Sequence, residues 1–343
     1  MFITPQVTIL TMKRLLEFIL ISLLITGSGC RPENHDQSKN TPNVTISIND
    51  ESKLNTARKY DLVENIVFTN TGNKQPEKFN LWVALIRTLP PYQVVNSTTI
   101  SPPDYTLVTD EHGNQYAEFD LKDIQAGQII SIDINYSVTV YEIQTEIQTC
   151  DGEMIKEYTQ PELHIESKNP QVQALADTLS NNTSTVCQKV GNFYHYIGDN
   201  LVYTPNDFNW GAQATFGEMG ADCTEYASLM IALSRSQKIP ARYLEGILYL
   251  ENQGKNSGRI EHAWLEVYLP SHGWVPIDPT LGRSPLTRNR YFAKVPADRF
   301  IVTLGRNPST LRGGSYFTYI YWPGNITTIE LTDQNWQIRL VNP

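Results

Sequence analysis

The stretch G-A-D-C-T-E-Y-A-S-L-M-I-A-L, residues 220–233, decides the fold of the second half of the chain. Its apolar residues recur at spacings of three and four, which predicts an amphipathic helix from Thr224 to Ser236. Asp222 follows a Gly-Ala turn and is suited to cap the N-terminus of that helix. Cys223 then lies at the first turn, where unpaired backbone N–H groups and the helix dipole favour a thiolate. The sequence therefore predicts a nucleophilic cysteine.

Two short runs downstream, 262–269 and 274–278, read as strands. The residues between them, P-S-H-G, are turn formers, so the simplest connection is an antiparallel hairpin. Pairing outward from a turn near Pro270 places His262 opposite Asp278, with Cβ atoms roughly 5 Å apart. We therefore expect the Asp278 carboxylate to orient the imidazole of His262.

A nucleophile of this kind needs a base within hydrogen-bond reach and a third group that fixes the base. The sequence supplies one residue of each kind, in the order Cys223, His262 and Asp278. A thiolate beside an imidazolium is reactive at neutral pH. The three residues therefore form a candidate catalytic triad.

Four blocks of this region resemble the transglutaminase-like superfamily of papain-like cysteine enzymes. They are a glycine shortly before a cysteine at a helix start, I-P-A-R (239–242), H-A-W-L-E-V (262–267) and G-W-V-P-I-D-P-T (273–280). The resemblance extends over 161–305. It implies a helix followed by an antiparallel sheet, with Cys223 as nucleophile, His262 as general base and acid, and Asp278 as the orienting carboxylate.

The resemblance leaves the reaction open, because the superfamily includes transglutaminases, peptidases, glycan-removing amidases and members that lack the catalytic residues. We expect a thiol enzyme that acts on an amide bond through a thioester acyl-enzyme, as a peptidase or amidase or in protein-glutamine acyl transfer. The alternative is a catalytically silent cell-envelope protein that binds peptides or glycans. The chain has no C-x-x-C or H-E-x-x-H motif, so we expect no metal and no cofactor.

Residues 1–30 have the features of a bacterial signal peptide. Basic residues precede an apolar run, and the segment ends in G-S-G-C, which resembles a lipoprotein signal and makes Cys30 the predicted lipidation site. Residues 31–42 are polar and read as a tether. We therefore expect an exported, lipid-anchored protein of the cell envelope, or else a soluble secreted or periplasmic one.

The net charge of −9 argues against a nucleic-acid partner, which normally requires a basic surface. The expected partners are a protein or peptide substrate and, through the lipidated N-terminus, a membrane.

The rest of the chain predicts an α+β protein with two domains. Residues 43–147 alternate apolar and polar positions between turn signals, for example from Ile130 to Val140, which is typical of a β-sandwich. Residues 158–343 form the predicted transglutaminase-like domain, with helices over 170–179 and 185–199 and further strands towards the C-terminus. The papain-like core is then helices packed on an antiparallel sheet.

Cys150 and Cys187 remain after the two functional cysteines are assigned. An exported protein permits them to form a disulfide, but Cys187 lies near a helix face where a buried free thiol is equally ordinary. Both alternatives stay open from the sequence.

Overall fold

The helix predicted after Gly220 forms as α4, Cys223–Ser236, and packs on an antiparallel sheet. The computed structural model describes residues 54–205, 210–217, 220–251, 261–306, 319–322 and 328–342. The predicted signal peptide, the lipidation site Cys30 and the tether 31–42 lie outside the described residues.

The sheet beside α4 has four antiparallel strands in the order β11-β7-β8-β9. Their bounds are Arg299–Leu304 for β11, Ala241–Leu248 for β7, Glu261–Leu269 for β8 and Gly273–Ile277 for β9. The predicted hairpin is the β8–β9 pair. The observed helices and antiparallel sheets confirm the α+β class.

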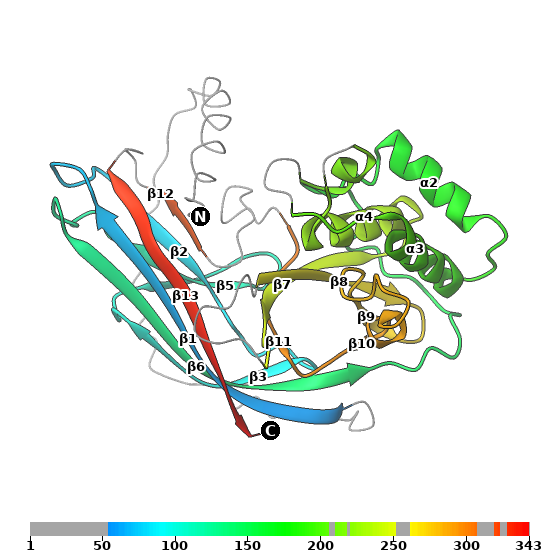
Figure 1. The fold of residues 1–343 in the computed structure, drawn as a ribbon, viewed down its shortest axis with the longest axis horizontal. Coiled ribbons are helices and arrows are strands. Elements are labelled where there is room, and N and C mark those ends of the chain that lie inside the picture. Colours follow the sequence, from blue (N-terminus) through cyan, green and yellow to red (C-terminus); the bar gives the residue numbers. More distant parts are fainter. Residues whose placement is uncertain are drawn as a thin grey trace, which may run out of the picture. The chain divides into compact units, whose positions relative to one another are not determined.

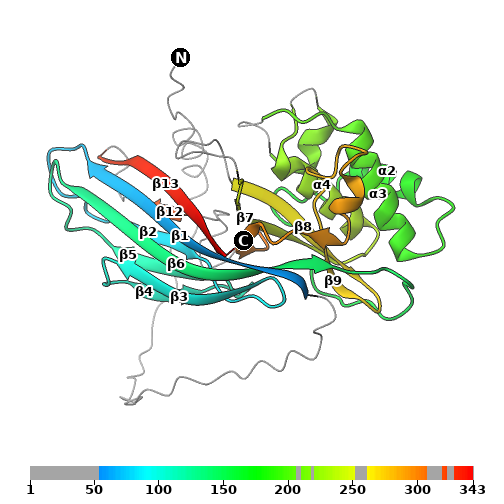
Figure 2. The same ribbon diagram turned by 60° about the horizontal axis from the view of Figure 1, so that its bottom comes forward.

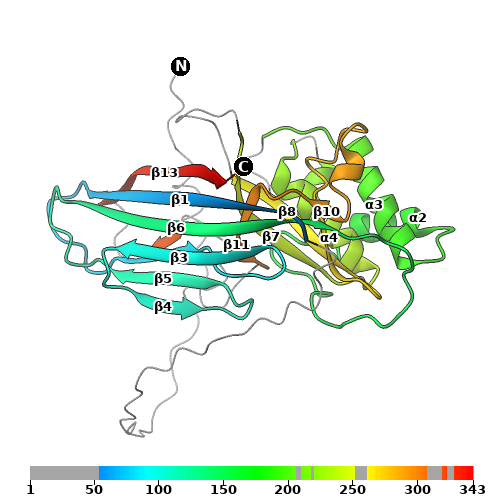
Figure 3. The ribbon, with the colours of Figure 1, turned by 90° about the horizontal axis from the view of Figure 1, so that it is seen from below.

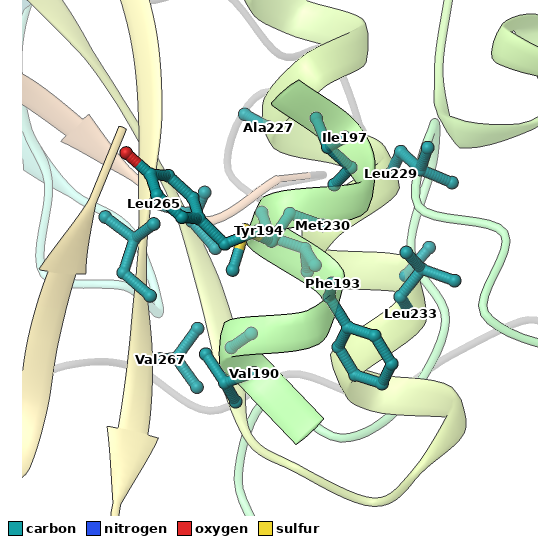
Figure 4. Close-up of a cluster of buried hydrophobic side chains, with 14 of the residues drawn as sticks. Val190, Phe193, Tyr194, Ile197, Ala227, Leu229, Met230, Leu233, Leu265 and Val267 are labelled. Atoms are coloured by element: carbon teal, nitrogen blue, oxygen red, sulfur yellow. The ribbon is translucent and has the colours of Figure 1, made fainter. Parts of the chain in front are cut away.

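The two further helices that the sequence predicted, α2 (Pro170–Ser180) and α3 (Val186–Asn200), pack against α4, which itself packs against β8 (Figure 1). Their apolar faces and one face of β8 form a single buried cluster. Figure 4 shows its members: Val190, Phe193, Tyr194 and Ile197 from α3, Ala227, Leu229, Met230 and Leu233 from α4, and Leu265 and Val267 from β8. In the part of the chain that the structure describes, no helix is long and apolar enough to cross a bilayer.

The N-terminal part is a sandwich of two antiparallel sheets. One sheet contains β1 (Leu54–Asn70), β3 (Gln93–Ser101), β6 (Ile129–Gln144), β10 (Lys294–Val295) and β13 (Ile329–Asn342). The other contains β2 (Asn80–Leu85), β4 (Thr106–Thr109), β5 (Gln115–Asp120) and β12 (Tyr319–Trp322). Alternate side chains of β1, such as Leu62 and Ile66, pack against Leu81 and Phe119 of the facing sheet. The alternation of apolar and polar residues in the sequence therefore identifies the side chains that face the interior of the sandwich.

Strands from the C-terminal segment complete both sheets of the sandwich. β13 pairs with β1 and β12 pairs with β2, so the sheet order β13-β1-β6-β3 can be followed in Figures 2 and 3. The sequence assigned 319–342 to the second domain, whereas the structure interleaves the two predicted domains. The physical reason is that β1 has two edges of backbone N–H and C=O groups, and β6 covers only one of them.

The sandwich also contacts the sheet that carries the hairpin. The hydroxyl of Tyr60 in β1 donates to the carbonyl oxygen of Ala297 over 2.8 Å. The amide of Gln93 in β3 donates to the carbonyl of Ile301 and accepts from its N–H, each over 2.8 Å. Phe300 belongs to the buried cluster of the sandwich. Strand β11 is therefore held by both parts of the molecule.

The helix–sheet cluster gives a stability prediction. Leu233 is fully buried in α4, whereas Leu286 is 96% exposed. We expect Leu233→Ala to lower the free energy of unfolding by about 2–5 kcal/mol, because it leaves a cavity. The same change at Leu286 should alter it by less than about 0.5 kcal/mol. Urea unfolding followed by circular dichroism measures both variants, and equal effects would contradict the packing described.

Candidate active site

Cys223 is the first residue of α4, and its cap is built from the neighbouring acidic residues. The Asp222 carboxylate accepts from the N–H of Thr224 over 2.9 Å, and the Glu225 side chain accepts from the N–H of Asp222 over 3.1 Å. This capping box confirms the predicted N-cap. The Cys223 thiol is free and partly exposed. A substrate therefore has access to a thiol at a helix N-terminus.

The loop before α4 is fixed by a close backbone approach. The Thr204 N–H donates to the Ala221 carbonyl over 2.9 Å, and Tyr203 forms a parallel bridge with Ala221. A Cβ at Gly220 would lie 2.3 Å from the Cβ of Thr204. Glycine is therefore required at 220 for the chain to approach and place Cys223.

His262 lies in β8 and Asp278 immediately after β9, and their side chains meet. Nε2 of His262 and Oδ2 of Asp278 are 2.8 Å apart, with 7% of His262 and none of Asp278 exposed. The Cys223 side chain lies close enough to the same imidazole to help raise its pKa. Because Nε2 faces Asp278, Nδ1 is the nitrogen left for the thiol. The structure therefore brings the three predicted site residues together.

The predicted pairing of His262 with Asp278 across the hairpin was wrong by two residues. Leu265 pairs with Ile277, and Leu269 with Gly273, so the turn is centred on Ser271. Ser271 and Gly273 both have positive φ, 67° and 74°. The type of turn, and with it the strand register, depends on these conformations and cannot be predicted from the number of turn residues alone. A shift of two keeps both side chains on the same face, so the contact survives.

Asp278 has two further partners. Oδ2 accepts from Nη1 of Arg299 over 2.9 Å, and Oδ1 accepts from the N–H of Leu281 over 2.9 Å. Arg299, the first residue of β11, is 5% exposed. The sequence analysis missed Arg299, because it belongs to none of the motif blocks and reaches the site only through sheet pairing.

The buried pair has strongly shifted pKa values. Burial alone would lower the pKa of His262, but the Asp278 carboxylate and the Cys223 side chain outweigh it and raise the pKa to about 9. Burial would raise the pKa of Asp278, but His262, Arg299 and the Leu281 N–H bring it down to about 2. The geometry therefore favours an imidazolium bonded to a carboxylate at neutral pH.

The shifted pKa values of His262 and Asp278 make the stability of the fold depend on pH. Charged His262 stabilises the fold fully below its ordinary pKa of 6.5, and this contribution is lost as the pH rises through about 9. Ionised Asp278 stabilises the fold above its ordinary pKa of 3.8, and its contribution is lost as the pH falls through about 2.

Glu225 is a second buried acid near the nucleophile. Its Oε1 accepts from the Gly211 N–H over 3.3 Å, so it joins the loop ahead of α4 to the helix cap. Burial and then the Asp222 carboxylate raise the pKa of Glu225 to about 8, so it is mostly protonated at neutral pH. The sequence signal that identifies it is the D-x-x-E spacing of a capping box.

A buried arginine lies over the strand next to the hairpin. The guanidinium carbon of Arg306 is 3.7 Å from the ring centroid of Tyr243 in β7, and Nη2 is 3.5 Å from Oε1 of Glu245. The carboxylate of Glu245, only 9% exposed, is thereby given a cationic neighbour.

Cys150 and Cys187 form a disulfide, with Cα atoms 6.0 Å apart. The bond joins the segment after β6 to α3, so it links the sandwich side of the chain to the helical layer. The alternative that the sequence left open is resolved in favour of pairing.

Sequence comparisons match the region that contains the site. Residues 173–279 match the Transglutaminase-like superfamily. The chain is 30% identical over 182 residues, 46% of its length, to the uncharacterized protein YebA of Bacillus subtilis. It is 29% identical over 132 residues, 34% of its length, to a protein-glutamine gamma-glutamyltransferase of Pseudomonas aeruginosa. The aligned regions span only 25% and 19% of those two relatives.

A solved structure matches a larger part of the fold. A Cytophaga hutchinsonii protein with the provisional name of cysteine protease covers 84% of this chain and 92% of its own, with a TM-score of 0.59 and 18% identity. At that identity the likeness shows a shared fold.

The electrostatics of the site give a second prediction. Asp278→Asn should bring the pKa of His262 down from about 9 towards its ordinary 6.5, because the amide removes the charge while the burial remains. The imidazolium is then lost at lower pH than in the wild type. NMR titration of the His262 ring measures this. Asp120→Asn, which removes an exposed carboxylate paired with Lys122, is the control and should leave the titration unchanged.

Proposed function

The chain carries a transglutaminase-like domain, and we propose that it is a cysteine-dependent enzyme that acts on amide bonds through Cys223, His262 and Asp278. The observation that carries the proposal is the buried 2.8 Å contact of His262 with Asp278, with the Cys223 side chain beside the same imidazole. A thiol, a base and an orienting acid in this order are the parts that activate a nucleophile.

The proposed reaction begins with the attack of Sγ of Cys223 on the carbonyl carbon of an amide. The C–N bond breaks, the proton of the imidazolium passes to the leaving nitrogen, and a thioester remains on Cys223. Neutral His262 then removes a proton from the second nucleophile as that nucleophile attacks the thioester carbon. The C–S bond breaks and the thiolate–imidazolium pair is restored.

The second nucleophile defines the activity. Water gives a peptidase or amidase, and a primary amine gives acyl transfer. One similar sequence is that of a protein-glutamine gamma-glutamyltransferase, and one solved structure with this fold carries the provisional name of a cysteine protease. We propose a protein or peptide as the substrate, since the Cys223 thiol is partly exposed at a helix end and one similar protein is a protein-glutamine gamma-glutamyltransferase.

We also propose that the protein works outside the cytoplasm, attached to the cell envelope through lipidated Cys30. The disulfide between Cys150 and Cys187 supports an oxidising compartment. The apolar run of the first thirty residues and the G-S-G-C sequence support export and lipidation.

Alkylation tests the thiol–imidazole pair without knowledge of the substrate. We expect iodoacetamide to modify wild-type Cys223 at pH 7 about tenfold or more faster than it modifies the His262→Ala variant, because an ordinary cysteine is only a few per cent thiolate at that pH. Peptide mass spectrometry gives the rates. His272→Ala, in the β8–β9 turn, is the matched control and should react like the wild type.

Equal rates in the wild type and His262→Ala would favour a binding protein that keeps the fold without catalysis.

Product analysis tests the reaction. A glutamine-containing peptide incubated with a fluorescent primary amine should become labelled if the activity is acyl transfer, and should release ammonia or be cleaved without labelling if water is the acceptor. Cys223→Ser should abolish either product, since it removes the thiolate. Product formation that survives this substitution would exclude the proposed nucleophile.

A further inference from the structure

The Asp278 carboxylate is shared by two cationic donors. Its Oδ2 accepts from Nε2 of His262 over 2.8 Å and from Nη1 of Arg299 over 2.9 Å, and Oδ1 accepts from the Leu281 N–H. The carboxylate is completely buried. A buried carboxylate keeps its charge only while positive or N–H partners remain on it.

Several neighbouring groups hold the side chain of Arg299 in place. Its guanidinium carbon lies 5.3 Å from the ring centroid of Trp264 and 5.7 Å from that of Tyr291. Nε is 3.3 Å from Oδ1 of Asp298. The carbonyl of Ala297, two residues earlier in the chain, accepts from the Tyr60 hydroxyl of the sandwich. Arg299 is therefore built into the molecule as a fixed charge behind the triad.

The positive charge of Arg299 is needed in the second half of the proposed reaction, when the thioester is hydrolysed. Once His262 has given its proton to the leaving amine, the imidazole no longer neutralises Asp278. If Asp278 then carried a proton, its O–H would donate to Nε2, and the ring proton would move to Nδ1. Nδ1 would lose the lone pair that must remove a proton from water.

We propose that Arg299 is a positioning residue: by holding Asp278 as a carboxylate while His262 is neutral, it keeps the imidazole proton on Nε2 and leaves Nδ1 free to act as the base in thioester hydrolysis. This inference rests on the proposed function. In the supported step, water forms a bond to the acyl carbon, its proton passes to Nδ1, the C–S bond breaks and Cys223 leaves as a thiolate. Arg299 touches none of the reacting atoms.

The other ionisable groups near Asp278 do not replace this charge. Tyr194 of α3 and Tyr291 both have pKa values raised first by burial, so their phenols are neutral. Asp298 pairs with Nε of Arg299 and is itself an acid, so it supplies no positive charge to Asp278. Among the described residues, Arg299 is the permanent cation that an ion pair joins to Asp278.

The test uses p-nitrophenyl acetate, which acetylates a reactive thiol, on the full chain. Acetylation of Cys223 and hydrolysis of the acetyl-enzyme are followed separately by intact-mass spectrometry across a pH series. The variants are Arg299→Gln, which keeps an N–H donor without the charge, and Arg299→Lys, which keeps the charge. Arg242→Met is the control, since it breaks another arginine–carboxylate pair, with buried Glu266, in the same sheet.

For Arg299→Gln we expect hydrolysis of the acetyl-enzyme to be about 10²-fold slower at neutral pH, the usual value of a general base. The acid limb of the pH–rate profile for this hydrolysis should move to higher pH, because loss of the Arg299 cation makes the His262–Asp278 pair hold its proton more tightly. Arg299→Lys and Arg242→Met should keep the wild-type limb.

An acid limb that stays at the wild-type pH in Arg299→Gln overturns the proposal. Hydrolysis that is slowed equally at all pH values in both Arg299 variants also overturns it, because it would indicate a purely structural role. If Arg299→Gln does not fold, Arg299→Lys is used in its place. An acid limb of the pH–rate profile that shifts although the positive charge is retained contradicts the proposal, and an unshifted acid limb supports it. If the wild type is not acetylated at Cys223, or His262→Ala hydrolyses the acetyl-enzyme normally, it is the proposed function that fails.

Discussion

The buried carboxylate of Asp278 is the constraint on which the rest of the site depends. An ionised group with no exposed surface must be compensated at short range. The compensation comes from His262 in β8, from Arg299 in β11 and from the backbone N–H of Leu281 in the loop after β9. The hairpin, the strand beyond it and the loop after β9 must all be in place for this charge to be tolerated. The site is therefore complete only when these strands of the sheet have paired.

The local parts of the active site were predictable from sequence because their causes are local. An apolar period of 3.6 defines α4, and a short polar residue before it defines the cap. The spacing of turn residues between two alternating runs predicts the β8–β9 hairpin. Its register was not predictable, because it depends on the backbone conformations of Ser271 and Gly273 within the turn. The error of two residues left the face unchanged, which is why the predicted contact was still found.

The parts that sequence reasoning missed depend on partners distant along the chain. Arg299 has an unremarkable local context, and its role follows only from the pairing of β11 with β7. The domain boundaries failed for a related reason: β12 and β13 carry strand patterns, but a pattern does not name the sheet that a strand joins. The sandwich was predicted as a separate domain, yet the Tyr60 hydroxyl donates to the carbonyl of Ala297, the residue before Asp298 and Arg299. Its role therefore includes support for the strand behind the triad.

The pairing of β1 with β13 also bears on how the molecule is made. The first described strand, Leu54–Asn70, finds one of its two neighbours in Ile329–Asn342, close to the last described residue. A chain emerging from the ribosome or threading through an export channel completes this sheet only after the whole intervening segment has appeared. Contacts of such long range are slow to form, and the open edge of β1 is exposed to wrong pairing in the meantime. The nascent chain therefore keeps one edge of β1 unpaired until its C-terminal strand arrives.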